Sequence, residues 1–182
     1  MSSHPHADPT PRNPDSMVRI VTAVRELALL DDPDRLTITA IVNRAGVSRP
    51  TFYAAFPDVP ASLAAAADDL LREVFSGIHP APPGTVDDSV IAEHLGTVLT
   101  RLRIHTAFFS RVLPSRAGFR VLRGVIEFVV ERLLGTPSAH TDVEAVEAVA
   151  AGAVWLIYRW LDSGCEESIA HVVTRVTGFI TR

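Results

Sequence analysis

The positions of proline place the strongest constraint on how this sequence can fold. The 13 prolines cluster near the N-terminus and around residues 80–83, stand singly or in close pairs elsewhere, and do not occur after Pro137. Proline lacks a backbone N–H and disrupts the interior of a helix or a central strand. Each helix or strand must therefore fit between two prolines or begin at one. Most of those stretches repeat apolar residues at helical spacing, and no convincing strand or internal repeat occurs. An all-α fold is therefore predicted.

Nine helices are expected from this spacing. Ser48 and Asp58 each precede a proline by two residues, an arrangement that suits an N-cap followed by a proline in the first turn. An alternation of Thr and Ile at the start of the second helix also permits a strand, which is the less favoured interpretation. The expected ranges are 16–30, 37–45, 49–55, 59–76, 87–102, 104–112, 115–134, 142–163 and 166–180.

Two of the later boundaries rest on further capping signals. The run from Thr141 to Glu144 has the pattern of a capping box, and Gly164 suits the end of the same helix. Glu166 and Glu167 are expected in the first turn of the last helix, where carboxylates interact favourably with the positive end of the helix dipole.

The helices divide into two regions after a terminal arm. Residues 1–14 are rich in Pro, Ser and His and are expected to be disordered. Residues 15–58 predict an N-terminal three-helix domain, and 59–182 predict a larger helical domain that begins with a connecting helix over 59–76.

Composition excludes several classes of protein. A single cysteine, Cys165, cannot form an intramolecular disulfide, and neither a signal peptide nor a membrane span is apparent, so a cytoplasmic protein is expected. The net charge is −4, from 17 Arg against 21 Asp and Glu, yet two stretches contain no acid. Residues 35–56 carry three Arg for +3, and residues 94–126 carry six for +6. The first of these basic stretches can meet nucleic acid even though the whole chain is acidic.

The stretch from Thr37 to Phe56 has the plan of a helix-turn-helix. Ala45 lets two helices approach closely, Gly46 suits a left-handed turn, and Val47 can fill the angle between them. Phe52 and Phe56 lie four residues apart and should face the interior. The opposite face of the second helix then presents Arg, Thr and Tyr side chains to DNA.

This segment resembles the tetracycline-repressor (TetR) family of bacterial transcription regulators. The resemblance spans about 27 residues and rests on Thr37-Ile38, Ile41-Val42, Ala45-Gly46-Val47-Ser48, Pro50, Phe52-Tyr53, Phe56 and Leu63. It implies a homodimer that binds an inverted-repeat DNA operator through the helix at 49–55. It also implies release when a small molecule occupies the C-terminal domain.

The expected DNA-binding residues follow from the motif and its exposed face. A solvated helix charge explains Arg44 as well as a phosphate contact does, and a purely structural helical hairpin is the alternative for the whole segment. Two departures from the family pattern, Ala55 and Val59, remove side chains that in the family approach phosphate. The candidates are Thr37, Arg44, Ser48, Arg49, Pro50, Thr51 and Tyr53.

The second basic stretch has two interpretations. Arg116, Arg120 and Arg123 lie on one helical stripe, with an i,i+4 pair from Arg123 to Glu127, which is typical of a solvated face. Alternatively, some of these arginines bind an anionic effector such as an organic acid or acyl thioester.

An effector pocket and a dimer interface are expected in the C-terminal region. Aromatic side chains commonly line ligand pockets, although ordinary core packing also explains them; the ligand candidates are His105, Phe108, Phe109, Phe128, Trp155 and Tyr158. Apolar stripes on the last two helices suit a two-fold four-helix interface, or alternatively the core of a monomer. The interface candidates are Val146, Val149, Ala153, Ile157, Leu161, Val172 and Val176.

These observations predict a DNA-binding transcriptional regulator that acts as a repressor and responds to an apolar or anionic effector. No catalytic motif is present: there is no glycine-rich phosphate loop, no nucleophile elbow and no close pair of His with a carboxylate. No enzyme activity, cofactor or metal site is therefore expected. The alternative is a helical protein-binding module whose contact with DNA has been weakened or lost.

Overall fold

The computed structural model describes residues 14–78, 88–134 and 142–181, and within them it contains helices and turns but no strand. The expected disordered arm up to residue 13, including Arg12, and the proline-rich loop at 79–85 lie outside the described residues. The helices are α1 (Pro14–Leu30), α2 (Ile38–Ala45), α3 (Arg49–Ala55), α4 (Val59–Val74), α5 (Asp88–Leu102), α6 (Thr106–Val112), α7 (Gly118–Leu134), α8 (Val143–Asp162) and α9 (Ile169–Ile180). Short 3-10 turns occupy Pro33–Arg35 and Arg103–His105.

Several helices begin where their capping residues require. The Ser48 side chain accepts a hydrogen bond from the Thr51 N–H at 3.2 Å, and Asp58 accepts one from the Ala61 N–H at 2.6 Å. These two bonds occupy N–H groups that have no partner within a helix. The all-α prediction is confirmed, and the strand alternative at the start of α2 is wrong.

Several helix boundaries differ from the expected ranges, and the starts of α7 and α9 shift most. Helix α1 already includes Pro14, which had been assigned to the arm. Helix α7 begins at Gly118 instead of residue 115, because the Ser115 side chain forms a turn that receives the Ala117 N–H. Helix α9 begins at Ile169 with Ser168 as its N-cap, so placing Glu166 and Glu167 in its first turn was wrong.

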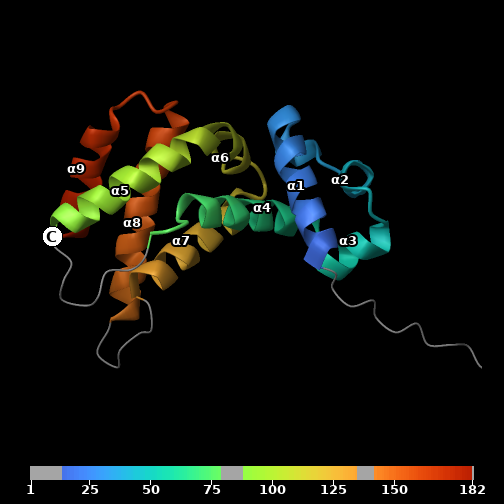
Figure 1. The fold of residues 1–182 in the computed structure, drawn as a ribbon, viewed down its shortest axis with the longest axis horizontal. Coiled ribbons are helices and arrows are strands. Elements are labelled where there is room, and N and C mark those ends of the chain that lie inside the picture. The colour runs from blue at the N-terminus through green and yellow to red at the C-terminus, as the bar shows by residue number, and fades with distance from the viewer. Residues whose placement is uncertain (1–13, 79–87, 135–141, 182) are drawn as a thin grey trace, which may run out of the picture.

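The first three helices form a small bundle around α1. Ile20 and Val24 of α1 are fully buried against Ile41 of α2 and Phe52 of α3. Figure 1 shows this bundle at one end of the molecule, with α4 leading away from it toward the remaining helices. The apolar residues that repeat at helical spacing thus form the core of the bundle.

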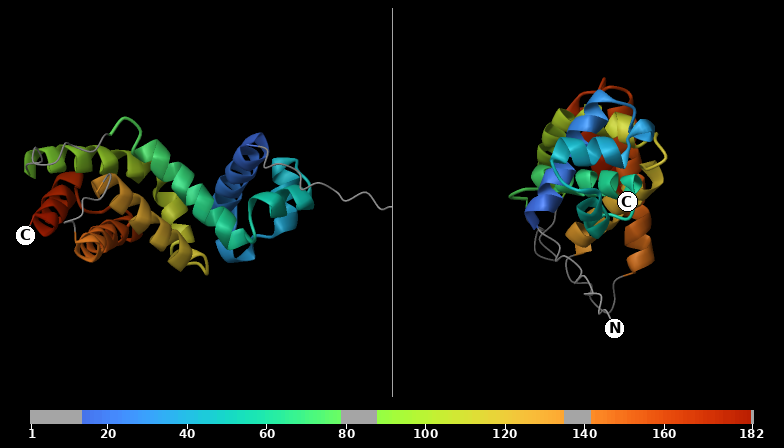
Figure 2. Two further views of the ribbon diagram at one scale, coloured as in Figure 1. Left: turned by 90° about the horizontal axis from the view of Figure 1, so that it is seen from below. Right: turned by 90° about the vertical axis from the view of Figure 1, so that its right-hand side faces the viewer.

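Helix α4 belongs to both halves of the molecule. It packs against α1 at one side and against α7 at another, while α5, α8 and α9 pack together farther from the first bundle. The turned view in Figure 2 shows α4 running between the two ends. The second bundle is filled by large buried side chains, including Leu99, Phe108, Val112 and Trp160.

Gly46 provides the turn between α2 and α3 and also accommodates an arginine from α1. Its φ angle is +62°, in the left-handed region that favours glycine, and an added Cβ would lie 2.6 Å from the Arg19 guanidinium. That guanidinium donates hydrogen bonds to the carbonyl oxygens of Ala45 at 2.6 Å and Gly46 at 2.7 Å. A side chain at Gly46 would therefore strain the turn and displace Arg19.

We expect Gly46→Ala to destabilise the chain more than Gly164→Ala. Gly164 has a similar φ of +73° but no neighbour within 4 Å of an added Cβ, so it controls for backbone strain alone. The strain costs about 1–2 kcal/mol at either position, and loss of the Arg19 bonds adds about 1 kcal/mol at Gly46. Urea unfolding curves of the two variants measure the difference. Equal destabilisation would show that Arg19 does not stabilise the turn.

Candidate nucleic-acid interface

The two helices of the helix-turn-helix are joined tightly. The N–H of Gly46 donates to the carbonyl oxygens near the end of α2, and the Val47 N–H donates to the Val42 oxygen at 3.0 Å. Val47 is half-buried and packs against the core, where it fills the angle between α2 and α3 as expected. The turn therefore fixes the direction of α3 relative to α2.

Helix α3 has one buried and one exposed face. Phe52 and Phe56 point into the bundle, and their ring centroids lie 5.9 Å apart. Tyr53 is 55% exposed, and Arg49 and Ala54 are exposed beside it. The exposed face of α3 thus presents a guanidinium and a phenol, as the residue spacing predicted.

The predicted DNA-binding hydroxyl groups already serve as helix caps. Thr37 caps α2 by accepting the Ala40 N–H at 3.2 Å, and Ser48 caps α3. The Ser48 and Thr51 hydroxyl oxygens also lie 2.7 Å apart. Pro50 is exposed in the first turn of α3. Ser48, Pro50 and Thr51 thus shape the N-terminal end of α3, which carries Arg49, and Thr37 shapes that of α2.

Two arginines of this region have different partners within the chain. Arg49 donates from Nη2 to the Thr39 hydroxyl at 2.5 Å, which holds its side chain across the face of α2 and α3. Arg44 pairs through Nε with Glu26 at 2.6 Å, and both side chains are about half exposed. Arg44 is therefore neither a free solvated charge nor an unpaired phosphate ligand in this structure.

Thr39 was missed by the sequence analysis. Its only signal was its place in the Thr-Ile-Thr alternation, which also suggested a strand.

The two residues that depart from the family pattern, Ala55 and Val59, are partly buried and pack against the core. Their small side chains therefore add to the apolar core behind α3 and not to its exposed face.

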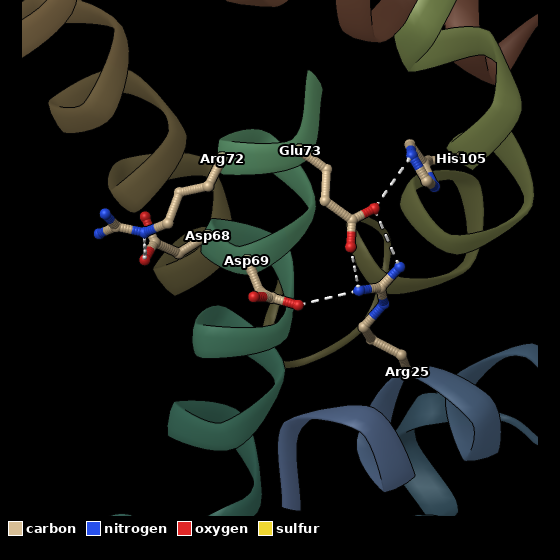
Figure 3. A network of polar contacts seen from close by, with 6 residues as sticks. All are labelled: Arg25, Asp68, Asp69, Arg72, Glu73 and His105. Carbon is tan, nitrogen blue, oxygen red and sulfur yellow. Dashed lines mark hydrogen bonds and ion pairs between the residues drawn. The ribbon is translucent and has the colours of Figure 1, made fainter. Parts of the chain in front are cut away.

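An ion-pair network joins α1 to α4 (Figure 3). Arg25 donates to Asp69 at 2.8 Å and to the two carboxylate oxygens of Glu73 at 2.6 and 3.3 Å. The hydrogen bond from Arg25 holds the pKa of Glu73 below its ordinary value. His105 lies 3.8 Å from Glu73, and burial lowers the pKa of its imidazole despite that carboxylate. The first bundle is thus tied electrostatically to the connecting helix.

Most arginines of the second basic stretch contact other parts of the chain. Arg101 donates to the carbonyl oxygens of Val74 at 3.0 Å and Ser76 at 2.5 Å, at the end of α4. Arg111 donates to the Leu29 oxygen at 2.8 Å.

Further contacts from the same stretch also reach the first bundle and its junction with α4. The backbone N–H of Arg116 donates to Asp34 at 2.9 Å, and Arg120 pairs with Asp58 at 3.2 Å. The expected pair from Arg123 to Glu127 is confirmed at 3.3 Å. Arg116, Arg120 and Arg123 are all exposed, as a solvated stripe requires, and Arg120 also pairs with Asp58 of the junction.

The predicted ligand residues lie in several different surroundings. Phe108 and Phe109 are buried in the core, and Phe128 packs its ring 5.3 Å from that of Phe75. Trp155 is 52% exposed and contacts Tyr158 on the outside of α8, with ring centroids 5.5 Å apart. His105 belongs to the network with Glu73. The six candidates are therefore divided among the core, the outer face of α8 and the network around Glu73.

Four of the seven predicted interface residues lie inside the chain's own core. Val172 and Val176 are fully buried, and Ala153 and Leu161 are nearly so, because α9 packs against both α5 and α8. These four side chains are not available to a partner. The other three, Val146, Val149 and Ile157, are half-buried.

A different stripe of α8 faces outward. Ala145, Ala148, Gly152 and Trp155 follow one another at helical spacing, and all except the half-buried Gly152 are exposed. The Phe179 ring of α9 lies directly over Gly152, whose missing side chain makes room for it. This face is apolar and consists mainly of small residues.

Neither a metal cluster nor a membrane helix occurs in the parts of the chain that the structure describes. No three His, Cys, Asp or Glu side chains come together there in a way that suits a metal ion. Among the described helices, none combines the length and apolarity needed to cross a bilayer.

Comparison with known proteins identifies the N-terminal region. Residues 20–58 match the family model of bacterial regulatory proteins, tetR family. No curated protein matches the chain by sequence. The matched family model describes regulatory proteins.

Solved structures of low sequence identity share the fold. A TetR transcriptional regulator from Rhodococcus sp. RHA1 is 19% identical, with a TM-score of 0.58 over 91% of this chain and 93% of that one. A tetR-family transcriptional regulator from Streptomyces coelicolor is 20% identical, with a TM-score of 0.57 over 91% and 78%. The fatty acid degradation regulator FadR from Bacillus halodurans is 15% identical, with a TM-score of 0.53 over 92% and 95%.

We expect Arg25→Gln to lower stability more than Arg72→Gln. Arg72 lies on α4 as well, but it pairs only with Asp68 one turn away, so it controls for removing an exposed ion pair. Arg25 is partly buried and joins two helices through two carboxylates. Its loss should cost about 1–2 kcal/mol, against about 0.5 kcal/mol for Arg72. Chemical denaturation measures both; equal losses would contradict the role of Arg25 in joining α1 to α4.

Proposed function

We propose that this chain is a DNA-binding transcriptional regulator of the TetR family, whose model matches residues 20–58, and that it is a homodimeric repressor released from its operator by a small molecule. In this proposal residues 15–58 bind DNA, and residues 59–182 bind the effector and form the dimer. The operator is an inverted repeat, because a two-fold dimer presents two identical recognition helices.

The observation that carries the DNA-binding role is the exposed face of α3. Arg49 and Tyr53 point away from the core at the end of a stretch, residues 35–56, with three Arg and no acid. Thr39 holds the Arg49 side chain in place at 2.5 Å. A pre-positioned guanidinium suits the O6 and N7 acceptors of guanine in the major groove. A modest charge of +3 per chain also favours dependence on specific contacts over non-specific attraction.

The dimer proposal rests on the outward stripe of α8. Ala145 and Ala148 leave room for close approach of a second helix, and Trp155 and Phe179, whose ring covers Gly152, supply exposed apolar area beside them. Exposed apolar surface of this kind is characteristic of protein contacts. A two-fold axis at this face would bring α8 and α9 of two chains together, with recognition helices about 34–36 Å apart in the DNA complex.

Effector control requires a connection from the C-terminal region to α3. Helix α4 supplies one, because Arg25 of α1 is bound to Asp69 and Glu73 of α4. Arg111 and Arg120 add contacts from α6 and α7 to the first bundle and its junction with α4. A ligand that shifts α4 would therefore move α1 and change the separation of the two recognition helices, which lowers operator affinity by a shift of population.

We expect replacement of both Arg49 and Tyr53 by Ala to reduce operator affinity by about 100-fold, from the lost base and phosphate contacts. The operator is first recovered by incubating the purified protein with genomic DNA fragments and sequencing those retained. Fluorescence anisotropy then gives the affinities, and circular dichroism checks the fold. Arg123→Ala removes an equal charge from α7 and should leave affinity nearly unchanged. Unaltered binding by the double variant would contradict the assignment; a folded wild-type chain without DNA binding would favour the protein-binding module.

We expect Ala148→Arg to convert the dimer to a monomer, because it places a long charged side chain where two helices must approach. Ala107→Arg makes the same change at an exposed position of α6 and should leave the dimer intact. Light scattering coupled to size-exclusion chromatography measures the mass of each variant. A dimeric Ala148→Arg variant would rule out this face of α8 as the interface.

A further inference from the structure

A groove opens between α4 and α7, and five of the six residues expected to bind a ligand are absent from its lining. Its volume is about 350 Å³, within the range of roughly 300–1,000 Å³ common for small-molecule sites. Phe128 is the only one of the six predicted ligand residues that lines it. The groove is therefore a separate candidate, defined by the packing of two helices.

The floor of the groove is apolar. Leu71, Val121 and Phe128 form part of its lining and are almost completely buried from water. Gly124 of α7 also lines it, and an added Cβ there would meet no atom within 4 Å. Glycine in the middle of a helix lowers helix stability relative to alanine by about 1 kcal/mol. Here its missing side chain leaves the groove open.

The rim of the groove is acidic. Asp68, Glu127 and Glu131 supply three carboxylates against one guanidinium from Arg72, so the charged lining sums to −2. Arg72 pairs with Asp68 at 3.0 Å, and Arg123 pairs with Glu127 at 3.3 Å.

Glu131 differs from the other two acids. Among the residues that the structure describes, no cation lies within ion-pair distance of its carboxylate. An apolar floor beside an unpaired carboxylate is complementary to a molecule with an apolar body and a positive charge. An anionic effector would meet a net repulsion at the same place.

We propose that this groove is the effector site and that it binds an amphipathic cation, with its apolar body against Leu71, Val121 and Phe128 and its ammonium group at Glu131. This inference rests on the proposed function, in which a small molecule controls DNA binding. It is preferred to the anionic alternative, because Arg101, Arg111 and Arg120 of the second basic stretch already bind other parts of the chain.

Helix α4 connects the groove to the DNA-binding helices through adjacent residues. Figure 3 shows Asp68 and Arg72 directed toward α7, and Asp69 and Glu73 directed toward Arg25 and His105. A ligand between α4 and α7 therefore acts on the same two helical turns that hold Arg25. This arrangement couples occupancy of the groove to the position of α1.

The test measures binding of two probes to the full-length chain by titration calorimetry, below their critical micelle concentrations. Octyltrimethylammonium supplies an apolar chain with a cation, and octyl sulfate supplies the same chain with an anion. We expect one cation per chain to bind and at least tenfold weaker binding of the anion. Glu131→Gln should weaken cation binding about two- to fivefold, the effect of one exposed ion pair.

Two leucine variants test the location. Gly124→Leu should fill the groove and abolish cation binding, while it improves helix propensity and so retains the fold. Gly178→Leu is the matched control, since Gly178 of α9 also has no neighbour within 4 Å of an added Cβ. Circular dichroism spectra and thermal melting confirm that both variants are folded.

The outcomes separate this inference from the proposed function. Failure of the cation to bind, preference for the anion, or unchanged binding by Gly124→Leu would overturn the cation site, while operator binding by the same protein would leave the DNA-binding role intact. Binding at the groove with no change in operator affinity would overturn its role as the effector site. Loss of operator binding in the wild-type chain would instead count against the proposed function.

Discussion

Helix α1 is the element on which both halves of this protein depend. Its apolar face, with Ile20 and Val24 fully buried, forms the centre of the first bundle. Its polar side then binds elsewhere: Arg19 holds the turn at Gly46, and Arg25 holds Asp69 and Glu73 of α4. One helix therefore fixes the direction of the recognition helix and joins it to the connecting helix. A change in the position of α1 must therefore affect both the recognition helix and the connecting helix.

Arginine performs this joining function throughout the molecule. Every basic residue in the sequence is Arg, and several of them donate to backbone carbonyl oxygens at the ends of helices. The guanidinium group carries several donors in a fixed plane and stays charged, so one side chain can satisfy two acceptors from different elements. The acid-free stretch at 94–126 thus serves mainly to attach α6 and α7 to α1 and α4. An acid-free stretch marks a nucleic-acid surface only where its cations point outward, as Arg49 does.

The geometry of α4 gives the proposed regulation a physical basis. Successive residues on this helix face different neighbours, so Asp68 and Arg72 border the groove while Asp69 and Glu73 bind α1. A rigid helix transmits a displacement from one face to the other without any flexible relay. Ligand and DNA would then be coupled by the free-energy difference between two positions of α4.

The sequence by itself determined the helices and the helix-turn-helix. Ser48, Asp58 and the prolines beside them act within a few residues, so the starts of α3 and α4 could be predicted from local chemistry. The inward direction of Phe52 and Phe56 followed from their spacing alone. The late start of α9 at Ile169, after the N-cap Ser168, was missed because several residues near it can cap a helix, and only packing selects one.

Only the tertiary structure decided what the polar and apolar surfaces meet. Arg25 and Asp69 are 44 residues apart and Arg111 and Leu29 are 82 apart, distances over which no spacing rule assigns a partner. Val172 and Val176 formed a plausible interface stripe, yet α9 turns them into the chain's own core and leaves Trp155 outside. The groove likewise arises from the approach of α4 and α7 around Gly124. Local sequence sets the direction in which each side chain leaves its helix, and the packing of distant helices sets what it reaches.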